Sequence, residues 1–283
     1  MSNKKDAMIS KNCGAVTSDI HVRATHLDIG YKEEVIVRDI NFDLKRGEAL
    51  AVIGTNGSGK TTMLKTIMGL LEPMGGELSV FGMPHRSNPS RMAYLGQFHN
   101  SGHILPIRAI DVVRMGRYPL HGLLHTMGKK DDEIVMAAMR TMGIEYLANA
   151  PLKSLSGGQQ QRIYLAQVLA HQADLIVMDE PTTGLDAGSR ELCLNAINDE
   201  LCRGTSVIMA THDIQDEAAL CHQVMLLAHK VVAIGSPDKV MTSETLLETF
   251  GVVVAGENKL HVLECKHGHD DKERQGLNRQ RKH

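Results

Sequence analysis

The chain has 283 residues, of which 42% are hydrophobic and 23% charged, and its formal net charge is -2. This length allows one large domain or two small ones, and the composition is ordinary for a soluble globular protein. The near-neutral charge gives no electrostatic basis for binding nucleic acid through its phosphates, and no run approaches the roughly 18 consecutive apolar residues of a membrane helix. A protein of this kind that serves a membrane process works from the aqueous side with a partner.

The first part of the chain predicts strands. Residues 1–18 are polar, and we expect them to form a disordered N-terminal tail. Residues 19–31 and 35–54 combine β-branched residues in partial alternation, which predicts strands joined by turns. A glycine-rich loop and a helix follow, and residues 75–83 predict another short strand. This region is therefore expected to be mainly β, with some antiparallel pairing.

The middle of the chain changes character, because helical spacing replaces the strand pattern. Residues 107–118 and 131–148 carry this spacing. We expect a helical subdomain at about 98–165, inserted into an α/β core. The α/β alternation then resumes. Its expected helices are 160–172 and 190–201, and its expected strands are 174–179 and 206–212.

The last part predicts a hairpin, a helix and a tail. Residues 224–235 are expected to form a hairpin that turns at His229 and Lys230. A last helix is expected to start at Ser236 and Pro237, a favourable N-cap and first-turn pair. From residue 256 to 283 we expect a polar tail, so that a single domain spans 19–255.

The stretch Gly54 to Thr61 fits the pattern G-x-x-x-x-G-K-[ST] between a predicted buried strand and a helix. Glycines allow backbone angles that point N–H groups at phosphate oxygens, and the helix start adds its positive dipole end. Lys60 would bridge β- and γ-phosphate oxygens, and the Thr61 hydroxyl would bind Mg²⁺. The alternative is a plain turn before a helix. The nucleotide-binding residues expected here are Gly54, Thr55, Asn56, Gly57, Ser58, Gly59, Lys60, Thr61 and Thr62.

A second motif, LSGGQQQR at 155–162, resembles the signature LSGGQ of the ATP-binding-cassette (ABC) ATPases. The resemblance extends over roughly residues 20–252, with the motifs in the order of that family. It implies a RecA-like P-loop α/β core with an antiparallel β part and the inserted helical subdomain. Two glycines after a serine open a helix, so N–H groups and a hydroxyl converge on a second anion site. The resemblance implies head-to-tail packing of two copies, in which Ser156, Gly157, Gly158 and Gln159 of one copy close on the γ-phosphate held by the other. A helix merely capped by Ser156 is the alternative.

Two acids follow the predicted strand at 174–179. Asp179 would hold Mg²⁺, through water, as in other P-loop ATPases. By the resemblance, Glu180 is the catalytic carboxylate that polarises the attacking water, for which it must be ionised and within reach. A solvated acidic pair at a strand end is the alternative. Asp186 matches the dimer-contact loop of the family.

Three further residues take roles only from the resemblance. His212 is the family's histidine that contacts the γ-phosphate and senses its loss, and Gln97 matches a glutamine at the junction with the helical subdomain. Gln97 would contact Mg²⁺ or water on a loop that responds to the membrane partner. Tyr31 lies where the family stacks an aromatic ring on adenine. The alternatives are a structural histidine, a surface glutamine and a core or surface tyrosine.

Two classes of ABC protein compete for the function. One is the ATPase subunit of a membrane transporter, and the other is a soluble machine for DNA repair, chromosome organisation or translation. The segment between Lys60 and Asp179 is too short for a long coiled-coil arm, there is one cassette, and the charge argues against DNA. We therefore expect transport, and import rather than export because no membrane span is fused to the cassette.

Residues 101–124 and 225–251 resemble the importer branch for manganese, zinc or iron, and the iron-siderophore and vitamin B12 branch is similar in both places. The resemblance implies ATP and Mg²⁺ as cofactors and a homodimer bound under multi-span permease subunits. That assembly would lie at the cytoplasmic face of the plasma membrane, with an extracytoplasmic solute-binding protein as indirect partner and no nucleic acid.

The expected tail contains residues of the types that bind soft and borderline metals. A metal sensor is one hypothesis, and a solvated polar terminus is the other, favoured because the spacing matches no closed site. The residues are His261, Cys265, His267, His269, Asp270 and Asp271.

Overall fold

The structure is a computed structural model that describes residues 19–97, 107–121, 127–214 and 216–251, together with the backbone of two strands at 253–256 and 259–262. The predicted N-terminal tail at 1–18 lies outside the described residues. The same is true of the side chain of His261 and of all the other candidate metal ligands of the tail.

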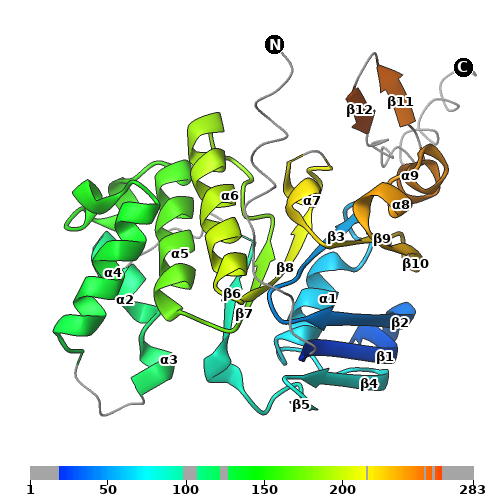
Figure 1. The fold of residues 1–283 in the computed structure, drawn as a ribbon, viewed down its shortest axis with the longest axis horizontal. Coiled ribbons are helices and arrows are strands. Elements are labelled where there is room, and N and C mark those ends of the chain that lie inside the picture. Colours follow the sequence, from blue (N-terminus) through cyan, green and yellow to red (C-terminus); the bar gives the residue numbers. More distant parts are fainter. Residues whose placement is uncertain are drawn as a thin grey trace, which may run out of the picture.

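A six-stranded sheet forms the centre of the molecule (Figure 1). Its strand order is β10-β9-β3-β8-β7-β6, with β10 antiparallel to its neighbour and all other pairs parallel. Every residue of β3, β7 and β8 is buried, as continuous apolar strands are when both faces of a sheet are covered. The strands are β3 (Ala49–Gly54), β6 (Met92–Leu95), β7 (Leu175–Asp179), β8 (Ser206–Thr211), β9 (Gln223–Leu227) and β10 (Val231–Gly235).

A second, antiparallel sheet has the order β2-β1-β4-β5. Its strands are β1 (Ile20–Tyr31), β2 (Glu34–Lys45), β4 (Gly75–Val80) and β5 (Met83–Pro84). Helix α1 (Lys60–Ile67) belongs to the apolar cluster that joins the two sheets, because Met63, Leu64 and Ile67 are fully buried there. This arrangement confirms the antiparallel β part expected for the first third of the chain.

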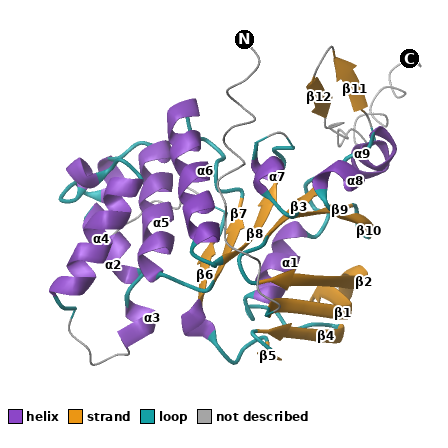
Figure 2. Cartoon of the chain, in the orientation of Figure 1, coloured by secondary structure: helices purple, strands orange, loops and turns teal. Residues whose placement is uncertain are grey.

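Helices cover the opposite face of the central sheet (Figure 2). In β3, Ala51 and Ile53 belong to the cluster under these helices, whereas Leu50 and Val52 belong to the cluster around α1, as the two-residue period of a strand requires. The helices that contact the sheet are α5 (Gly157–His171) and α6 (Ala187–Cys202), and α2 (Ala109–Met115) and α4 (Lys129–Thr141) pack against α5. The remaining elements of this part are α3 (Tyr118–His121) and 3-10 turns at Glu145–Leu147 and Leu152–Ser154. Together these elements supply the helices predicted at 107–118 and 131–148 and those predicted at 160–172 and 190–201.

Shorter elements connect and complete the sheets. A 3-10 turn at Pro89–Arg91 leads into β6, and α7 (Glu217–Leu220) follows β8. β9 and β10 form the expected hairpin, with His229 at a φ of 55° and the Ala228 N–H donating to the Lys230 carbonyl at 2.9 Å. The helix expected at Ser236 is α8 (Pro237–Val240), and α9 (Ser243–Phe250) follows it. None of the helices in the described part of the chain is long and apolar enough to span a membrane.

A two-stranded antiparallel sheet, β11 (Val253–Gly256) and β12 (Lys259–Val262), lies at the point where the sequence suggested the start of a polar tail. The sequence signal for it is a valine-rich run followed by glycine and asparagine and then a second apolar run. The expected boundary at residue 256 therefore falls inside this hairpin.

Candidate active site

Several of the predicted site residues lie at the carboxyl ends of the central strands. Ile53, near the end of β3, pairs with Thr211 at the end of β8, and Asp179 at the end of β7 pairs with Ala210. His212 follows β8 directly. The three strand ends therefore lie side by side, at the edge where open α/β sheets bind their ligands.

Glycines shape the loop after β3. Gly57 has a φ of 82° and Gly59 a φ of 108°, in the left-handed region that favours glycine. A Cβ added to Gly54 would lie 2.1 Å from the Leu227 carbonyl oxygen, so only glycine fits there. A Cβ added to Gly57 would meet nothing within 4 Å, so the loop faces open space at that point.

Polar groups of this loop fit an anionic ligand. The Ser58 Oγ is buried and has no hydrogen-bond partner among the residues that the structure describes. The Lys60 side chain is buried, and its Nζ donates to the carbonyl oxygens of Gly54 at 2.7 Å and Thr55 at 2.9 Å. The first turn of α1 carries no acid. An ammonium group, an orphaned hydroxyl and a positive helix end together suit a phosphate chain.

The next residue of α1 reaches across to β7. The Thr61 Oγ1 donates to the Asp179 Oδ2 at 2.6 Å. Asp179 is 3% exposed, and burial raises the pKa of its carboxyl group while the Thr61 hydroxyl lowers it. A hydroxyl beside a carboxylate is a pair of hard oxygen ligands of the kind that Mg²⁺ uses together with phosphate oxygens. The residues present therefore fit this ion, and over the described ranges no cluster of three or more His, Cys, Asp or Glu side chains offers another metal site.

Glu180 and His212 lie close to each other, and Glu180 directly follows Asp179 in the chain. Glu180 adopts a φ of 52°, and its N–H donates to the Ala210 carbonyl at 2.9 Å. Its Oε2 accepts from the Thr183 hydroxyl at 3.1 Å, and its Oε1 lies 3.9 Å from the His212 Nδ1. The Glu180 side chain is 14% exposed and that of His212 is 62% exposed. The carboxylate is therefore held by the protein, whereas the imidazole faces solvent.

Gln97 lies where the chain leaves the central sheet, at the same edge. It lies just beyond β6, whose Leu95 pairs with Met178 of β7, and Glu180 follows that strand. Gln97 is exposed.

Tyr31 lies at the tip of the β1–β2 hairpin and is 56% exposed. This hairpin touches the glycine loop, because a Cβ added to Gly59 would lie 2.8 Å from the Val37 Cγ2. The exposed ring thus stands on the strand pair that borders the loop.

The signature residues form the start of α5. Ser156 is the N-cap: its Oγ accepts from the Gln159 N–H at 3.3 Å, and its own N–H donates to the Gln159 Oε1 at 2.9 Å. This reciprocal pair is a capping box, whose S-x-x-Q pattern is contained in the motif, so Ser156 and Gln159 also have a local role in starting the helix. A Cβ added to Gly157 would meet nothing within 4 Å. The motif therefore offers an open, exposed helix start.

The structure does not bring the signature and the glycine loop together on one side of the sheet. The buried residues of α1 pack between the two sheets, whereas those of α5 pack in the helical layer on the other face. Within one chain, the two predicted phosphate sites are therefore carried by helices on opposite faces.

Asp186 also has a local role. Its Oδ1 accepts from the Ser189 N–H at 2.8 Å, and this bond caps α6 and lowers the pKa of the Asp186 carboxyl group.

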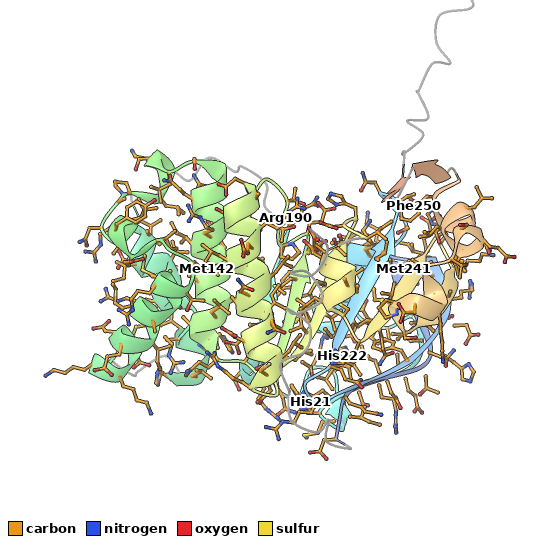
Figure 3. The ribbon with its side chains drawn as sticks, turned by 45° about the horizontal axis from the view of Figure 1, so that its top comes forward. His21, Met142, Arg190, His222, Met241 and Phe250 are labelled. Atoms are coloured by element: carbon orange, nitrogen blue, oxygen red, sulfur yellow. The ribbon has the colours of Figure 1, made fainter. Side chains whose placement is uncertain are left out.

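Several polar side chains next to the site make contacts that no sequence motif predicts. The Gln161 Nε2 donates to the Pro181 carbonyl at 3.0 Å, and the Thr182 hydroxyl donates to Glu217. Arg190, which Figure 3 shows on α6 at the boundary between the helices and the sheet, donates to the Asp213 Oδ2 at 2.8 Å. The available signal is weak, because a polar residue on a helix is usually solvated.

A strand, a glycine loop closed by a lysine, a helix start and a hydroxyl–carboxylate pair together define the site of a P-loop nucleoside triphosphatase. Residues 37–183 match the family model described as ABC transporter. The chain belongs to the ABC transporter family and is one of its ATP-hydrolysing subunits. This membership confirms the family and the enzyme class expected from the two motifs.

Among its curated relatives is the manganese transport system ATP-binding protein MntB of Bacillus subtilis, with 33% identity over 230 residues, 81% of this chain and 92% of that protein. The zinc transport system ATP-binding protein TroB of Treponema pallidum is 34% identical over 230 residues, 81% of this chain and 86% of that protein. The chelated iron transport system protein YfeB of Yersinia pestis is 32% identical over 220 residues, 77% of this chain and 74% of that protein.

Solved structures share the fold. An inward-facing metal-chelate type ABC transporter aligns with a TM-score of 0.72 at 27% identity, covering 86% of this chain and 96% of that chain. A dimeric bacterial ABC transporter cassette aligns with a TM-score of 0.65 at 24% identity, covering 76% of this chain and 98% of that chain. The predicted fold class, a P-loop α/β core with an antiparallel sheet and a helical part, is confirmed.

Proposed function

We propose that the chain is the ATP-hydrolysing subunit of an importer for metal ions such as manganese, zinc or iron. The observation that carries this proposal is the set of relatives named for manganese, zinc and chelated iron transport, each at least 32% identical over 220 residues or more. A metal chelate, such as an iron-siderophore or vitamin B12, is the second candidate cargo. It is supported by the similarity to a metal-chelate type transporter.

The proposed assembly is a homodimer under multi-span permease subunits, at the cytoplasmic face of the plasma membrane. Two observations support the head-to-tail pairing: the exposed start of α5 with its capping box, and the location of α1 and α5 on opposite faces of the sheet. Ser156, Gly157, Gly158 and Gln159 of one copy would then reach the phosphates in the other, next to Asp186. A solute-binding protein would supply the cargo from outside.

The glycine loop would bind the triphosphate of ATP. Lys60 would exchange the carbonyl oxygens of Gly54 and Thr55 for phosphate oxygens, and the orphaned Ser58 hydroxyl would gain an acceptor. Thr61 and Asp179 would hold Mg²⁺, with Gln97 at the same edge of the sheet. When bound, this ion neutralises negative charge on the phosphates. Tyr31 would stack on the adenine, since its exposed ring borders the loop.

Hydrolysis requires a base that activates water and a residue that contacts the terminal phosphate and senses its loss. Glu180 is proposed as the base, because the Thr183 hydroxyl orients its carboxylate and little of it is exposed to solvent. His212 is proposed as the phosphate-sensing residue, since its exposed imidazole stands 3.9 Å from that carboxylate and can turn toward a ligand.

The test of the cargo is metal uptake in a strain that lacks the gene. Complementation with the wild-type chain should restore the lost metal content, measured by elemental mass spectrometry, and complementation with Lys60→Ala should not. Unchanged manganese, zinc and iron contents in the deletion strain would refute metal import. Loss of siderophore-bound iron or vitamin B12 uptake, with free-ion uptake unaffected, would favour the second candidate.

A further inference from the structure

The two residues that follow Glu180 are held from both sides by buried side chains. On one side, Gln161 of the signature helix α5 donates from its Nε2 to the Pro181 carbonyl at 3.0 Å. On the other side, the Thr182 hydroxyl donates to the Oε1 of Glu217, the first residue of α7. We call Gln161 and Glu217 the clamp.

Both clamp residues are polar groups placed where burial is costly. Glu217 is 1% exposed and Gln161 is 6% exposed. Burial raises the pKa of the Glu217 carboxyl group, against the opposing effects of the Thr182 and Thr211 hydroxyls. A leucine or methionine would fill either position without this desolvation cost. Packing alone therefore does not explain a carboxyl group and an amide at these positions.

The clamp links the segments that carry the proposed catalytic groups. Pro181 and Thr182 continue directly from Glu180, which adopts a φ of 52°, a backbone conformation that is uncommon outside glycine and has to be held by its neighbours. Glu217 lies on the segment after His212, and Asp213 fixes that segment by accepting from the Asp216 N–H at 3.0 Å and from Arg190 at 2.8 Å. A shift of α7 or of α5 would therefore be transmitted to Glu180.

We propose that Gln161 and Glu217 are positioning residues for ATP hydrolysis, which fix the Glu180 carboxylate relative to His212 and to the signature helix. The proposal rests on the proposed roles of Glu180 and His212. Neither clamp residue needs to touch the nucleotide. Gln161 acts through the backbone carbonyl of Pro181, and Glu217 acts through the hydroxyl of Thr182. Through Gln161, the base of one ATP site is tied to the helix whose exposed start is proposed to serve the other site.

The test compares kcat and the KM for ATP in variants of the full chain that each replace one clamp residue. Gln161→Met and Glu217→Leu preserve volume and are expected to lower kcat roughly tenfold to a hundredfold, because a displaced base loses its alignment with water. The KM for ATP should stay within about twofold, since the glycine loop is untouched. Glu217→Gln keeps an oxygen that accepts from Thr182 and should restore kcat to within about threefold of wild type.

A second arm tests whether the two residues act on one segment. The double variant Gln161→Met/Glu217→Leu should lose less activity than the product of the two single losses, because either substitution already releases the segment. A full product would show independent effects and overturn the clamp. If Glu217→Leu does not fold, Thr182→Val removes the same hydrogen bond from the other side and is expected to give the same loss of kcat.

Glu200 supplies a matched control. Like Glu217, it is a buried glutamate whose pKa is raised by burial and whose carboxyl group accepts from a threonine hydroxyl, that of Thr205 at 3.1 Å. Unlike Glu217, it also pairs with an arginine, Arg203. It lies near the end of α6, away from Glu180. Glu200→Leu should change the melting temperature and leave kcat unaltered. If Glu217→Leu behaves in the same way, the clamp is a structural contact and the proposal is wrong.

A parallel Glu180→Gln assay separates the proposed role of Glu180 from the proposed role of the clamp. Rapid turnover by that variant would refute the proposed role of Glu180, and the clamp with it. An inactive Glu180→Gln protein beside fully active clamp variants would refute the clamp alone.

Discussion

The substitution Glu180→Gln tests the proposed base with little change to the structure. Glutamine has the same shape as glutamate, and its amide oxygen can accept the hydrogen bond that the Thr183 hydroxyl now donates at 3.1 Å. The Glu180 N–H bond to the Ala210 carbonyl belongs to the backbone and is retained. The substitution therefore removes the ability to accept a proton and leaves the site otherwise intact.

The size of the effect follows from that difference. Positioned general bases contribute about a hundredfold to ten-thousandfold to the rate. At about 1.4 kcal/mol for each factor of ten, this corresponds to about 3–6 kcal/mol of barrier height. Binding of ATP should be unaffected, because the lysine, hydroxyls and glycines of the loop lie on β3 and α1 rather than on β7. We therefore expect kcat to fall by at least a hundredfold and the dissociation constant for ATP to stay within about threefold.

The assay is phosphate release under saturating ATP and magnesium, together with size-exclusion chromatography of the variant with ATP. The variant should elute as a closed dimer that retains nucleotide. Glu248→Gln is the control, because Glu248 is a half-exposed glutamate on α9 that pairs with Lys230, and it should hydrolyse ATP at the wild-type rate. A kcat for Glu180→Gln within threefold of wild type would refute the proposed role.

Four further outcomes are expected at the same site. Lys60→Ala should weaken ATP binding at least tenfold by titration with a fluorescent analogue, and unchanged affinity would contradict the phosphate role of the buried ammonium. Burial raises the pKa of Asp179 above its unfolded value of about 3.9, because it disfavours the ionised carboxylate. The folded state therefore has its full stability below that pH, where the carboxyl group is protonated, and loses stability as the pH rises and the group ionises. Asp179→Asn should therefore raise the melting temperature of the nucleotide-free protein at pH 7, lose this gain near pH 4 and abolish magnesium-dependent hydrolysis; an unchanged melting temperature at pH 7 would count against a costly buried charge. Asp186→Ala should lower the melting temperature by a few degrees because α6 loses its cap, whereas Asp186→Asn should not, and equal melting temperatures would show that the cap contributes nothing. His212→Ala should lower kcat while leaving the melting temperature unchanged, because most of the imidazole is exposed; wild-type turnover would remove it from the mechanism.

The sequence predicted the fold class and the family because the decisive signals are local. The glycines and lysine between 54 and 61 are required by a short stretch of backbone, and the signature at 155–162 is recognisable residue by residue. The strands at 49–54, 174–179 and 206–212 were evident from their continuous apolar runs, because parallel strands are covered on both faces. The hairpin at 253–262 was missed, since a short apolar run near a polar terminus gives little signal over the background of the tail.

The sequence by itself determined which chemical groups the site contains: a phosphate-binding loop, two acids after a buried strand and a histidine after another. Only the tertiary structure decided how they meet. Strand order places β8 between β3 and β7, so Asp179 reaches Thr61 and Glu180 faces His212 across chain separations that no motif encodes. The same packing placed Gln161 and Glu217 on either side of the residues after Glu180. The reason is physical, because hydrogen-bond partners of buried polar groups are set by which elements pack together and not by their spacing along the chain.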